Sequence, residues 1–465
     1  MTERNCLHCV LPPHMLENIA RNGTGEERDW ALRTLAVDSS TRQVRAEREL
    51  MRAPVAVFGA AGPHKKRLIH DAKTGTTLPG TLVRSEGQAA TGDAAVDEAY
   101  DGLGATFDLY WDIYQRDSID NAGMDLIGTV HYDKKYDNAF WNDVQMVFGD
   151  GDGQYFNRFT IAIDIMGHEL THGVTAHQAN LVYHDQPGAL NESLSDVFGS
   201  LVKQYAQSPR QTAADADWLI GAGLFTPAIN GIALRSMKAP GTAYDDRVLG
   251  KDPQPDHMSK YVNTTRDNGG VHINSGIPNR AFYLAAIALG GYAWEKAGKI
   301  WYATNCDPRL SPTASFQDFA NLTADNAAKL FDADVAAKVA EAWRQVGINV
   351  AVPGLSGDWI LHYSWGSTTT YGQASITFNA DHSFSGSNTG QWRLRDGTLL
   401  LSYTSGPAKY AGTLDSNVAN GEMSTFAGLD GAWYLTRKGI VGVMDDTSAG
   451  VLAARQPYDA AGSTW

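Results

Sequence analysis

Apolar residues recur at helical spacing through most of residues 158–350, and this pattern predicts a mainly helical region. The pattern is clearest over residues 159–177, where one side is apolar throughout, and over residues 191–206, where Leu, Val and Phe side chains share one face. Further helices are expected over residues 281–297, 316–330 and 335–346, the last ending at Gly347.

Residues 55–155 follow a different pattern, in which short β-like runs alternate with Gly-rich turns. Residues 67–70 and 126–130 are examples of such runs. Residues 94–116 interrupt them with apolar positions at helical spacing, so we expect one helix within a β-rich region.

The two ends of the chain differ from the middle. Residues 1–50 are charged and polar, with one short apolar patch from Val10 to Ile19. Residues 42–52 are rich in Arg and Glu and lack an apolar face, which predicts a solvated helix or linker open to proteolysis. Residues 356–465 are rich in Gly, Ser, Thr, Trp and Tyr and contain short alternating runs such as 374–378, which predicts an all-β sandwich or small barrel.

The composition fits a globular protein of two or three domains. The chain has 465 residues, of which 43% are hydrophobic and 19% charged. No apolar run reaches the ~20 residues of a membrane-spanning helix. The net charge of −14 argues against nucleic acid and anionic membranes as partners. We therefore expect a monomer that binds neither.

Three cysteines are too few for a disulfide framework. Cys6 and Cys9 form a CxxC pair near the start, which could bind a metal or react with oxidants but is more often a pair of free thiols. Cys306 stands alone. The first residues do not lead into an apolar core, so we predict no signal peptide, and either a cytoplasmic location or export by another route.

The strongest chemical signal is His168-Glu169-Leu170-Thr171-His172. Two histidines four residues apart on a helix lie one turn above each other, so both rings can bind one metal ion, with Glu169 beside it. With 13 histidines in the chain, a chance match to this short pattern has a probability of roughly a few per cent. The motif alone therefore predicts a metal site and little more.

A catalytic zinc site needs a third protein ligand and one open position. Glu192 and Asp196 share one face of a predicted helix, so Glu192 is the natural third ligand and Asp196 can fix the tautomer of a ligand histidine. Two solvated acids on a helix explain this segment equally well by itself. His272 lies in a Gly- and Asn-rich turn, where a histidine is usually a surface or capping residue.

Together these segments resemble the thermolysin family of neutral metalloproteases, over a stretch from about residue 55 to residue 350. Besides the histidine helix, the matching motifs are Asn138–Asn142, Gly149–Gly153, Asn191–Asp196, Leu234–Met237 and Asp267–Gly276. The resemblance implies the α+β fold class, with a β-rich N-terminal lobe, a helical C-terminal lobe and the zinc-binding helix at the floor of the cleft between them. It also implies a zinc-dependent endopeptidase.

The resemblance assigns catalytic roles position by position. The matching zinc ligands are His168, His172 and Glu192. Glu169 matches the general base, and Asp196 matches the carboxylate that holds His168. Tyr183 and His272 match the donors that stabilise the oxyanion, and Asp267 matches the carboxylate that orients His272.

The substrate-binding positions follow in the same way. The residues that match those holding the substrate backbone are Asn138, Ala139 and Arg235. The positions that line an apolar pocket in the family are Phe156, Phe159, Ile165 and Leu234. That pocket takes the residue just after the scissile bond, so the resemblance implies a preference for a large hydrophobic residue there.

The segment Pro12–Ile19 looks like the short propeptide of protealysin-like members of the family. We therefore expect a zymogen in which the chain's own propeptide occupies the cleft and is cut off near residues 50–55. The expected domains are a propeptide over residues 1–52, the β-rich lobe over 53–158, the helical lobe over 159–352 and the accessory β-domain over 356–465.

One departure from the family concerns calcium. Thermolysin binds a pair of calcium ions beside the active-site helices through a cluster of acids. Asp164 and Asp217 match two of those acids, but the remaining positions are Lys203, Leu219 and Ala222. Because a lysine ammonium repels a cation and can pair with the remaining acids, we predict that the double calcium site is absent, while a single calcium elsewhere stays possible.

Two other functions are compatible with parts of the pattern. A zinc aminopeptidase shares the HExxH motif and Glu ligand but needs an acidic anchor for the substrate amine, whereas Asn138 and Ala139 match main-chain clamps. An inactive peptidase scaffold used for binding is disfavoured because all catalytic positions are filled. The tryptophans of the β-domain could form a ligand-binding face, but core packing is the commoner reason for such residues.

Overall fold

The computed structural model describes residues 10–49, 62–350, 355, 357–366, 370–379, 382–395, 398–415, 418–425 and 427–438. The Cys6–Cys9 pair and Trp465 lie outside this part of the chain. The chain divides into two compact units, one formed by residues 1–326 and 341–350 and the other by residues 327–340 and 351–465. Among the described residues, no helix combines the length and the hydropathy needed to cross a bilayer.

The N-terminal lobe contains a five-stranded sheet in the order β2-β1-β3-β5-β4. Its strands are β1 (Arg67–Asp71), β2 (Thr81–Ser85), β3 (Leu126–Val130), β4 (Ala139–Trp141) and β5 (Met146–Phe148). The strands β1, β3 and β5 run parallel, while β2 and β4 are antiparallel edge strands. Helix α3 (Ala94–Tyr114) packs beside the sheet and starts at Asp93, whose carboxylate caps the backbone N–H groups of residues 95 and 96. The edge strand β4 contains Ala139, and Asn138 directly precedes it, so two of the three predicted substrate clamps lie at this edge of the sheet.

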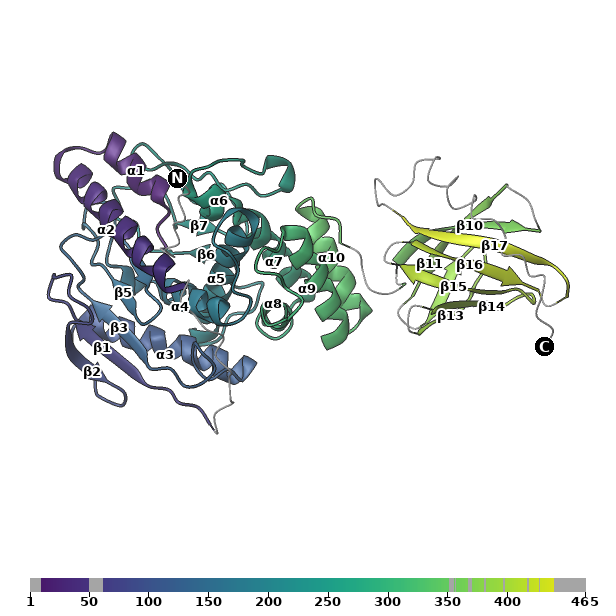
Figure 1. The fold of residues 1–465 in the computed structure, drawn as a ribbon, viewed down its shortest axis with the longest axis horizontal. Coiled ribbons are helices and arrows are strands. Elements are labelled where there is room, and N and C mark those ends of the chain that lie inside the picture. The colour runs from purple at the N-terminus through teal and green to yellow at the C-terminus, as the bar shows by residue number, and fades with distance from the viewer. Residues whose placement is uncertain are drawn as a thin grey trace. The chain divides into compact units, whose positions relative to one another are not determined.

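The C-terminal lobe is helical, as the apolar periodicity predicts (Figure 1). Its helices are η1 (Phe159–Ile161), α4 (Ile163–His177), α5 (Asp185–Ala206), η2 (Met258–Lys260), α6 (Asp267–Asn274), α7 (Gly276–Leu289), α8 (Ala297–Asn305), α9 (Phe316–Leu330) and α10 (Ala333–Gln345). Two short ribbons accompany them, β6 (Leu219–Ile220) with β7 (Arg235–Ser236) and β8 (Asp245–Asp246) with β9 (Gly250–Lys251). The helix predicted over residues 281–297 is present as α7, but its predicted end is wrong, because α7 stops at Leu289 before Gly290 and Gly291, which both have positive φ angles.

The close crossing of α4 and α5 depends on two glycines. A Cβ atom on Gly199 of α5 would lie 2.4 Å from the backbone oxygen of Asp164 on α4. One on Gly167 of α4 would lie 2.9 Å from the Cα atom of Gly199. Because neither position leaves room for a side chain, the two helix backbones touch where the histidine motif faces Glu192.

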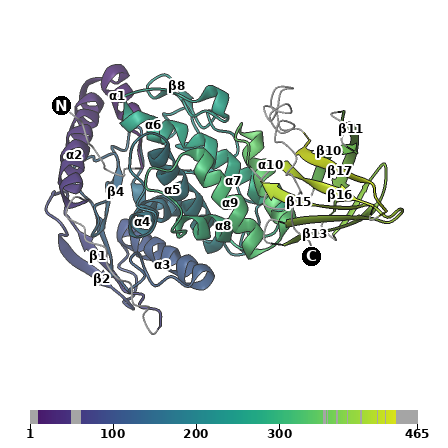
Figure 2. The same ribbon diagram turned by 45° about the vertical axis from the view of Figure 1, so that its right-hand side comes forward.

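Two N-terminal helices lie against this unit, α1 (Pro13–Asn22) and α2 (Gly25–Glu49) (Figures 1 and 2). Pro13 occupies the first helical turn of α1, where its missing N–H costs nothing. The helix buries one apolar face, formed by Met15, Leu16 and Ile19. Its polar side chains reach the β8–β9 ribbon, since Asn18 Nδ2 donates to the backbone oxygen of Leu249 at 2.8 Å. The stretch predicted as a helix or linker is helical up to Glu49, and residues 50–52 lie outside the described part.

The second unit contains a closed barrel of eight antiparallel strands, each paired with its neighbours in sequence. The strands are β10 (Gly357–Trp365), β11 (Gly372–Phe378), β12 (Ser383–Gly386), β13 (Gly390–Arg395), β14 (Thr398–Tyr403), β15 (Lys409–Asp415), β16 (Val418–Ser424) and β17 (Asp430–Arg437). Pairing of β10 with β17 closes the barrel. Trp359, Trp392 and Trp433 are buried in its core, and Trp365 packs against that core. The prediction of core-packed tryptophans is therefore confirmed for these four.

Candidate active site

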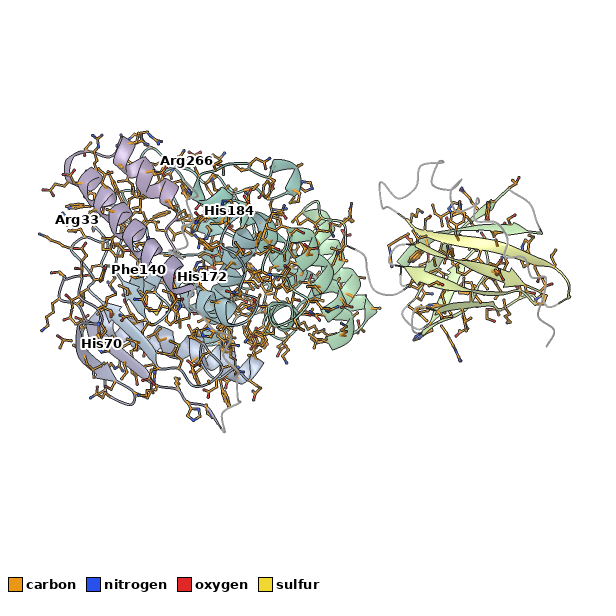
Figure 3. All side chains as sticks on the ribbon, in the orientation of Figure 1. Arg33, His70, Phe140, His172, His184 and Arg266 are labelled. Carbon is orange, nitrogen blue, oxygen red and sulfur yellow. The ribbon has the colours of Figure 1, made fainter. Side chains whose placement is uncertain are left out.

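Helix α4 buries both histidines of the HExxH motif at its centre, and Figure 3 labels one of them, His172. His168, Glu169 and His172 have no exposed surface. The four-residue spacing places the two rings on one face of the helix, with their Nε2 atoms 3.0 Å apart. Helix α5 supplies Glu192, whose Oε2 lies 3.5 Å from Nε2 of His168 and whose Oε1 lies 3.4 Å from Nε2 of His172. The ligand atoms of this trio all lie within 4.8 Å of one another, so they could hold one metal ion.

The opposite ring nitrogens show which tautomer each histidine adopts. His168 Nδ1 lies 2.8 Å from Asp196 Oδ1, and His172 Nδ1 lies 2.9 Å from Asn191 Oδ1. The amide nitrogen of Asn191 donates to the backbone oxygen of Leu181, so its oxygen is the atom that faces His172. Both histidines therefore carry their proton on Nδ1 and direct an Nε2 lone pair at the other ring.

This arrangement fits a bound cation. Two imidazole lone pairs and a carboxylate converge in a buried space, and Glu192 Oε2 has no hydrogen-bond donor among the described residues. The two Nε2 lone pairs and Glu192 Oε2 share no proton and repel one another in a low-dielectric interior, whereas a divalent cation would satisfy all three. Nitrogen and carboxylate ligands of this kind suit zinc.

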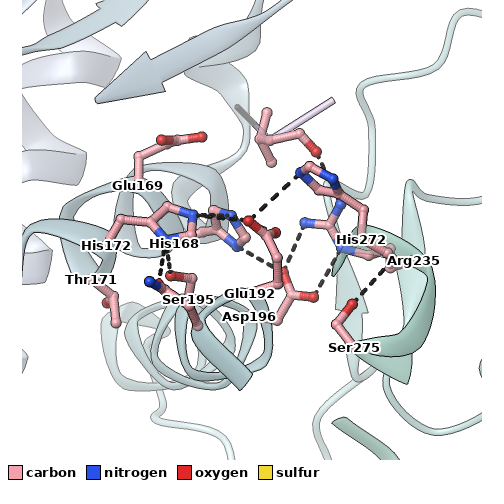
Figure 4. A network of polar contacts seen from close by, with 12 residues as sticks. His168, Glu169, Thr171, His172, Glu192, Ser195, Asp196, Arg235, His272 and Ser275 are labelled. Atoms are coloured by element: carbon pink, nitrogen blue, oxygen red, sulfur yellow. Dashed lines mark hydrogen bonds and ion pairs between the residues drawn. The ribbon is translucent and has the colours of Figure 1, made fainter. Parts of the chain in front are cut away.

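Besides His168, two residues donate three hydrogen bonds to Asp196 (Figure 4). Arg235 donates to it twice, from Nε at 2.9 Å and Nη2 at 2.8 Å, and Asn279 Nδ2 donates at 2.8 Å. Burial alone would raise the pKa of Asp196, but the charge of Arg235 and the hydrogen bond from His168 outweigh burial and keep that pKa well below its usual range. Asp196 therefore stays ionised and fixes His168.

Tyr183 and His272 both lie next to Glu192. The Tyr183 hydroxyl donates to Glu192 Oε1 and lies 3.3 Å from His272 Nε2. Asp267 accepts from Nδ1 of His272 at 2.6 Å and from its backbone N–H at 3.0 Å. Burial lowers the pKa of His272, but Asp267 and Glu192 together raise that pKa to about 9. The histidine is therefore a hydrogen-bond donor toward the site.

The turn before His272 has a backbone that only certain residues tolerate. Asp267, Asn268, Gly269 and Gly270 all have positive φ angles. A Cβ atom on Gly269 would lie 2.1 Å from Asp185 Oδ1, so both the angle and the space require glycine there. The turn folds Asp267 back onto His272.

Glu169 points away from the trio toward the edge strand β4. Its Oε2 accepts the backbone N–H of Trp141 at 3.0 Å. The sequence did not predict this contact of Trp141, because any residue type except proline can donate a backbone N–H. Asn191 was missed for another reason: an amide beside Glu192 looks like an ordinary polar helix residue, although its place next to a predicted ligand was a usable hint.

The predicted substrate clamps hold the N-terminal segment of the same chain. Leu11 N donates to Asn138 Oδ1 at 3.1 Å, and Val10 N lies 3.4 Å from the backbone oxygen of Ala139. Arg235 Nη1 donates to the backbone oxygen of Val10 at 2.9 Å. Both Val10 and Leu11 are fully buried.

A second contact from the N-terminal helices reaches the same clamp. Asp38 of α2 accepts from Asn138 Nδ2 at 2.9 Å and from the Tyr136 hydroxyl at 2.6 Å. The Asn138 side chain is therefore held on both its oxygen and its nitrogen. Residues 10–38 bind the positions that the resemblance assigns to the substrate backbone.

The four predicted pocket residues are buried next to α4. They are Phe156, Phe159, Ile165 and Leu234. The rings of Phe156 and Phe159 pack with their centroids 5.9 Å apart. Their role as a pocket stays a prediction.

At the predicted calcium positions a lysine lies among the acids. Lys203 Nζ is 3.4 Å from Asp164 Oδ2 and 2.8 Å from Asp217 Oδ2, and it donates to the backbone oxygen of Leu219 at 3.2 Å. Burial lowers the pKa of Lys203, but the two carboxylates outweigh it and raise that pKa. The ammonium is therefore charged and occupies space between the two acids.

Comparison with known proteins agrees with this geometry. The family model described as "Thermolysin metallopeptidase, catalytic domain" matches residues 23–176, and the one described as "Thermolysin metallopeptidase, alpha-helical domain" matches residues 179–348. An "Extracellular metalloprotease" of Pectobacterium carotovorum is 57% identical over 348 residues, which cover 73% of this chain and 96% of that protein. "Protease PrtS" of Photorhabdus is 50% identical over 73% of this chain and 92% of its own.

More distant relatives and a solved structure extend the comparison. "Thermolysin" of Alicyclobacillus acidocaldarius is 41% identical over 60% of this chain and 50% of its own. The solved precursor of protealysin, a metalloproteinase from Serratia proteamaculans, is 57% identical and covers 73% of this chain and 99% of its own, with a TM-score of 0.67. The chain belongs to the thermolysin family of metallopeptidases.

Proposed function

We propose that this metalloendopeptidase is a zinc enzyme made as a zymogen, and that it cleaves internal peptide bonds just before a large hydrophobic residue. The observation that carries the proposal is the convergence of His168, His172 and Glu192 on one point, with both histidine Nδ1 protons engaged elsewhere. His168, His172 and Glu192 would hold the metal. A zinc ion bound there supplies Lewis acidity, which polarises the substrate carbonyl and lowers the pKa of water to ~7.

The chain's own residues move the protons. Glu169 takes a proton from the attacking water and later gives it to the leaving amine. Its contact with Trp141 N keeps the carboxylate on the β4 side of the histidine pair, next to the substrate backbone. Tyr183 and His272 donate to the carbonyl oxygen as negative charge develops on it, and each donor contributes on the order of 3 kcal/mol.

Substrate binding uses the clamps that the N-terminal segment occupies. An extended substrate backbone would meet two acceptors, on Asn138 and Ala139, and one donor, on Arg235. The same three groups bind the backbone of Val10 and Leu11. The buried apolar residues beside α4 support the preference for a large hydrophobic residue after the scissile bond. An aminopeptidase needs an acidic anchor for the substrate amine, whereas an endopeptidase binds an internal peptide through its backbone. The backbone contacts of Asn138 and Ala139 therefore favour an endopeptidase.

The same contacts support latency. We assign residues 1–52 to a propeptide, residues 53–158 and 159–352 to the two peptidase lobes and residues 356–465 to an accessory domain. A propeptide seated in the clamps excludes substrate until it is cut off near residues 50–55. The precursor form of the protealysin structure supports this assignment.

The Lys203 ammonium also supports our proposal that the double calcium site is absent. It lies between the two carboxylates that remain from the family's acid cluster. A lysine supplies the positive charge without any metal.

The function is tested with the Glu169→Ala variant and a peptide blocked at both ends. We expect the wild-type enzyme to cleave the blocked peptide before a large hydrophobic residue, and the variant to keep its zinc while losing activity on the order of 10³-fold. His168→Ala serves as the control that loses zinc. Self-maturation of Glu169→Ala would rule out the assigned base, and an intact blocked peptide with the wild-type enzyme would indicate an aminopeptidase.

A further inference from the structure

Helix α1 follows directly on Val10 and Leu11, so its attachment decides whether these two residues stay in the clamps. Four polar side chains of α1 contact the helical lobe, and they are His14, Glu17, Asn18 and Asn22. Of these residue types, only histidine has an ordinary pKa between pH 5 and pH 8. His14 is also the only histidine among residues 10–49. A change in pH over this range therefore acts on the attachment of α1 through His14.

The hydrogen-bonding groups around His14 suit its neutral form. Nε2 of the ring lies 3.0 Å from the Tyr244 hydroxyl, which can donate or accept a hydrogen bond. His14 keeps some exposed surface, but its Nδ1 atom is buried and has no hydrogen-bond partner among the described residues. A neutral ring can leave a bare lone pair on Nδ1, whereas a protonated ring would place a charged N–H there without an acceptor.

The charges around His14 also disfavour a positive ring. Burial is the largest cause that lowers the pKa of His14, and the positive charges of Arg235, Arg266 and His272 add to it. Asp267 raises that pKa, but its carboxylate also accepts from His272 Nδ1. The acid of α1, Glu17, pairs with Arg266. The resulting pKa of His14 is about 4, and Figures 1 and 2 show α1 beside α6, which supplies Asp267 and His272.

We propose that His14 is an acid-sensitive anchor of the N-terminal segment, and that its protonation detaches α1 and withdraws Val10 and Leu11 from the clamps. The proposal rests on the latency proposed above. A cut near residues 50–55 leaves every contact of α1 in place, so the cut segment stays bound at neutral pH. When α1 leaves Tyr244, the ring reaches water and takes up a proton from solvent. Because the pKa of the bound ring lies below the free value of 6.5, the attachment is at full strength above pH ~6.5 and weakens as the pH falls toward 4.

The test uses the full-length protein carrying Glu169→Ala, which prevents self-cleavage, and measures hydrogen exchange of residues 10–22 at pH 7.5 and pH 5.5. After correction for the intrinsic exchange rate at each pH, we expect the opening of this segment to increase on the order of tenfold at pH 5.5. Adding His14→Asn should remove this increase, because an amide does not titrate. The matched change Glu17→Gln removes another side-chain contact of α1 and should leave the increase in place.

Exchange of helix α3 in the same samples reports the general stability of the peptidase unit and should not change between the two pH values. Equal opening of residues 10–22 at both pH values would overturn the role of His14 and leave the latency intact. An increase that persists in His14→Asn, or that α3 shares, would also overturn that role. Residues 10–22 without protection at pH 7.5 would instead refute the binding of this segment in the clamps, and with it the proposed latency.

Discussion

At the scale of single residues, the proposed metal site is defined by its hydrogen-bond donors and acceptors as much as by its proposed ligands. One ligand histidine faces a carboxylate, Asp196, and the other faces a neutral amide, Asn191. Arg235 balances the charge of Asp196, so the charge of Glu192 is left for the metal to neutralise. The proposed site therefore offers two imidazole nitrogens and one carboxylate. A divalent cation bound there would meet one negative charge, that of Glu192, and would leave only a small net charge in the interior.

Another histidine, outside the proposed metal site, contributes to the pH dependence of stability. His131 Nδ1 lies 2.9 Å from Asp150, and its Nε2 lies 3.1 Å from Asp93. The hydrogen bond to Asp150, opposed by burial and helped by Asp93, raises the pKa of His131 to about 9. Because this pKa lies above the unfolded value of 6.5, the stabilisation is fully present below pH ~6.5 and is lost as the pH rises through ~9.

We expect His131→Asn to remove this pH dependence. Both acids are partly exposed, so the difference between wild type and variant should be only about 1 kcal/mol at pH 6 and should vanish near pH 10. Urea unfolding of the Glu169→Ala protein and of the same protein with His131→Asn, at several pH values, measures it. A difference that grows with pH would contradict the assignment.

At the scale of elements, the packing of α4 on α5 brings together ligands from two helices. Gly167 and Gly199 let the backbones touch, and this contact places Glu192 opposite the histidine pair. The helices themselves were predictable because each buries one apolar face. The way in which the two helices cross was not predictable, because it depends on contacts between backbones and on the absence of a side chain at two positions, Gly167 and Gly199.

Replacement of Gly199 with alanine tests the crossing. The new Cβ atom would meet the Asp164 oxygen at 2.4 Å and the His168 nitrogen at 3.1 Å, and neither backbone atom can move alone. We expect a loss of about 1–3 kcal/mol of stability and weaker zinc binding, measured by thermal unfolding and metal content. Gly102→Ala is the matched control, since its Cβ would meet the flexible Met166 side chain and should cost less. Unchanged zinc binding in Gly199→Ala would show that the helices tolerate separation.

The Lys203 contacts join α4, α5 and the loop that carries Asp217. We expect wild-type thermal unfolding to be insensitive to a calcium-selective chelator, because Lys203 supplies the positive charge there. Lys203→Met should destabilise the protein by ~3 kcal/mol, since it leaves the buried Asp164 without its partner. A marked loss of wild-type stability with the chelator would refute the absence of the calcium pair.

Local patterns predicted the helical and β-rich regions and the histidine pair, because these depend on spacing within one segment. The choice of Glu192 over a solvated acid rested on the resemblance. They did not predict contacts between distant segments. The α7 boundary at Gly290 was missed because apolar residues continue past two left-handed glycines. The hydrogen bond from Leu11 to Asn138 spans 127 residues, and no spacing rule reports on it.

At the scale of the whole molecule, the relatives separate the peptidase from the barrel. The solved protealysin precursor is covered over 99% of its length by 73% of this chain, and the helical family model ends at residue 348. A chain of that extent therefore folds without a barrel. The barrel has its own core around Trp359 and Trp433, and its first and last strands pair with each other.

We expect truncation after residue 354 to leave activity on small blocked peptides within about twofold of wild type, because every residue assigned to the metal, the base and the clamps lies before residue 280. The closing contact of the peptidase unit, in which Trp343 donates to Thr323 at 2.8 Å, stays in the truncated chain. Activity on a small peptide and thermal unfolding of both forms measure the effect. An inactive truncated chain with normal zinc content would mean that the barrel acts on catalysis, and an unfolded one would mean that it belongs to the catalytic fold.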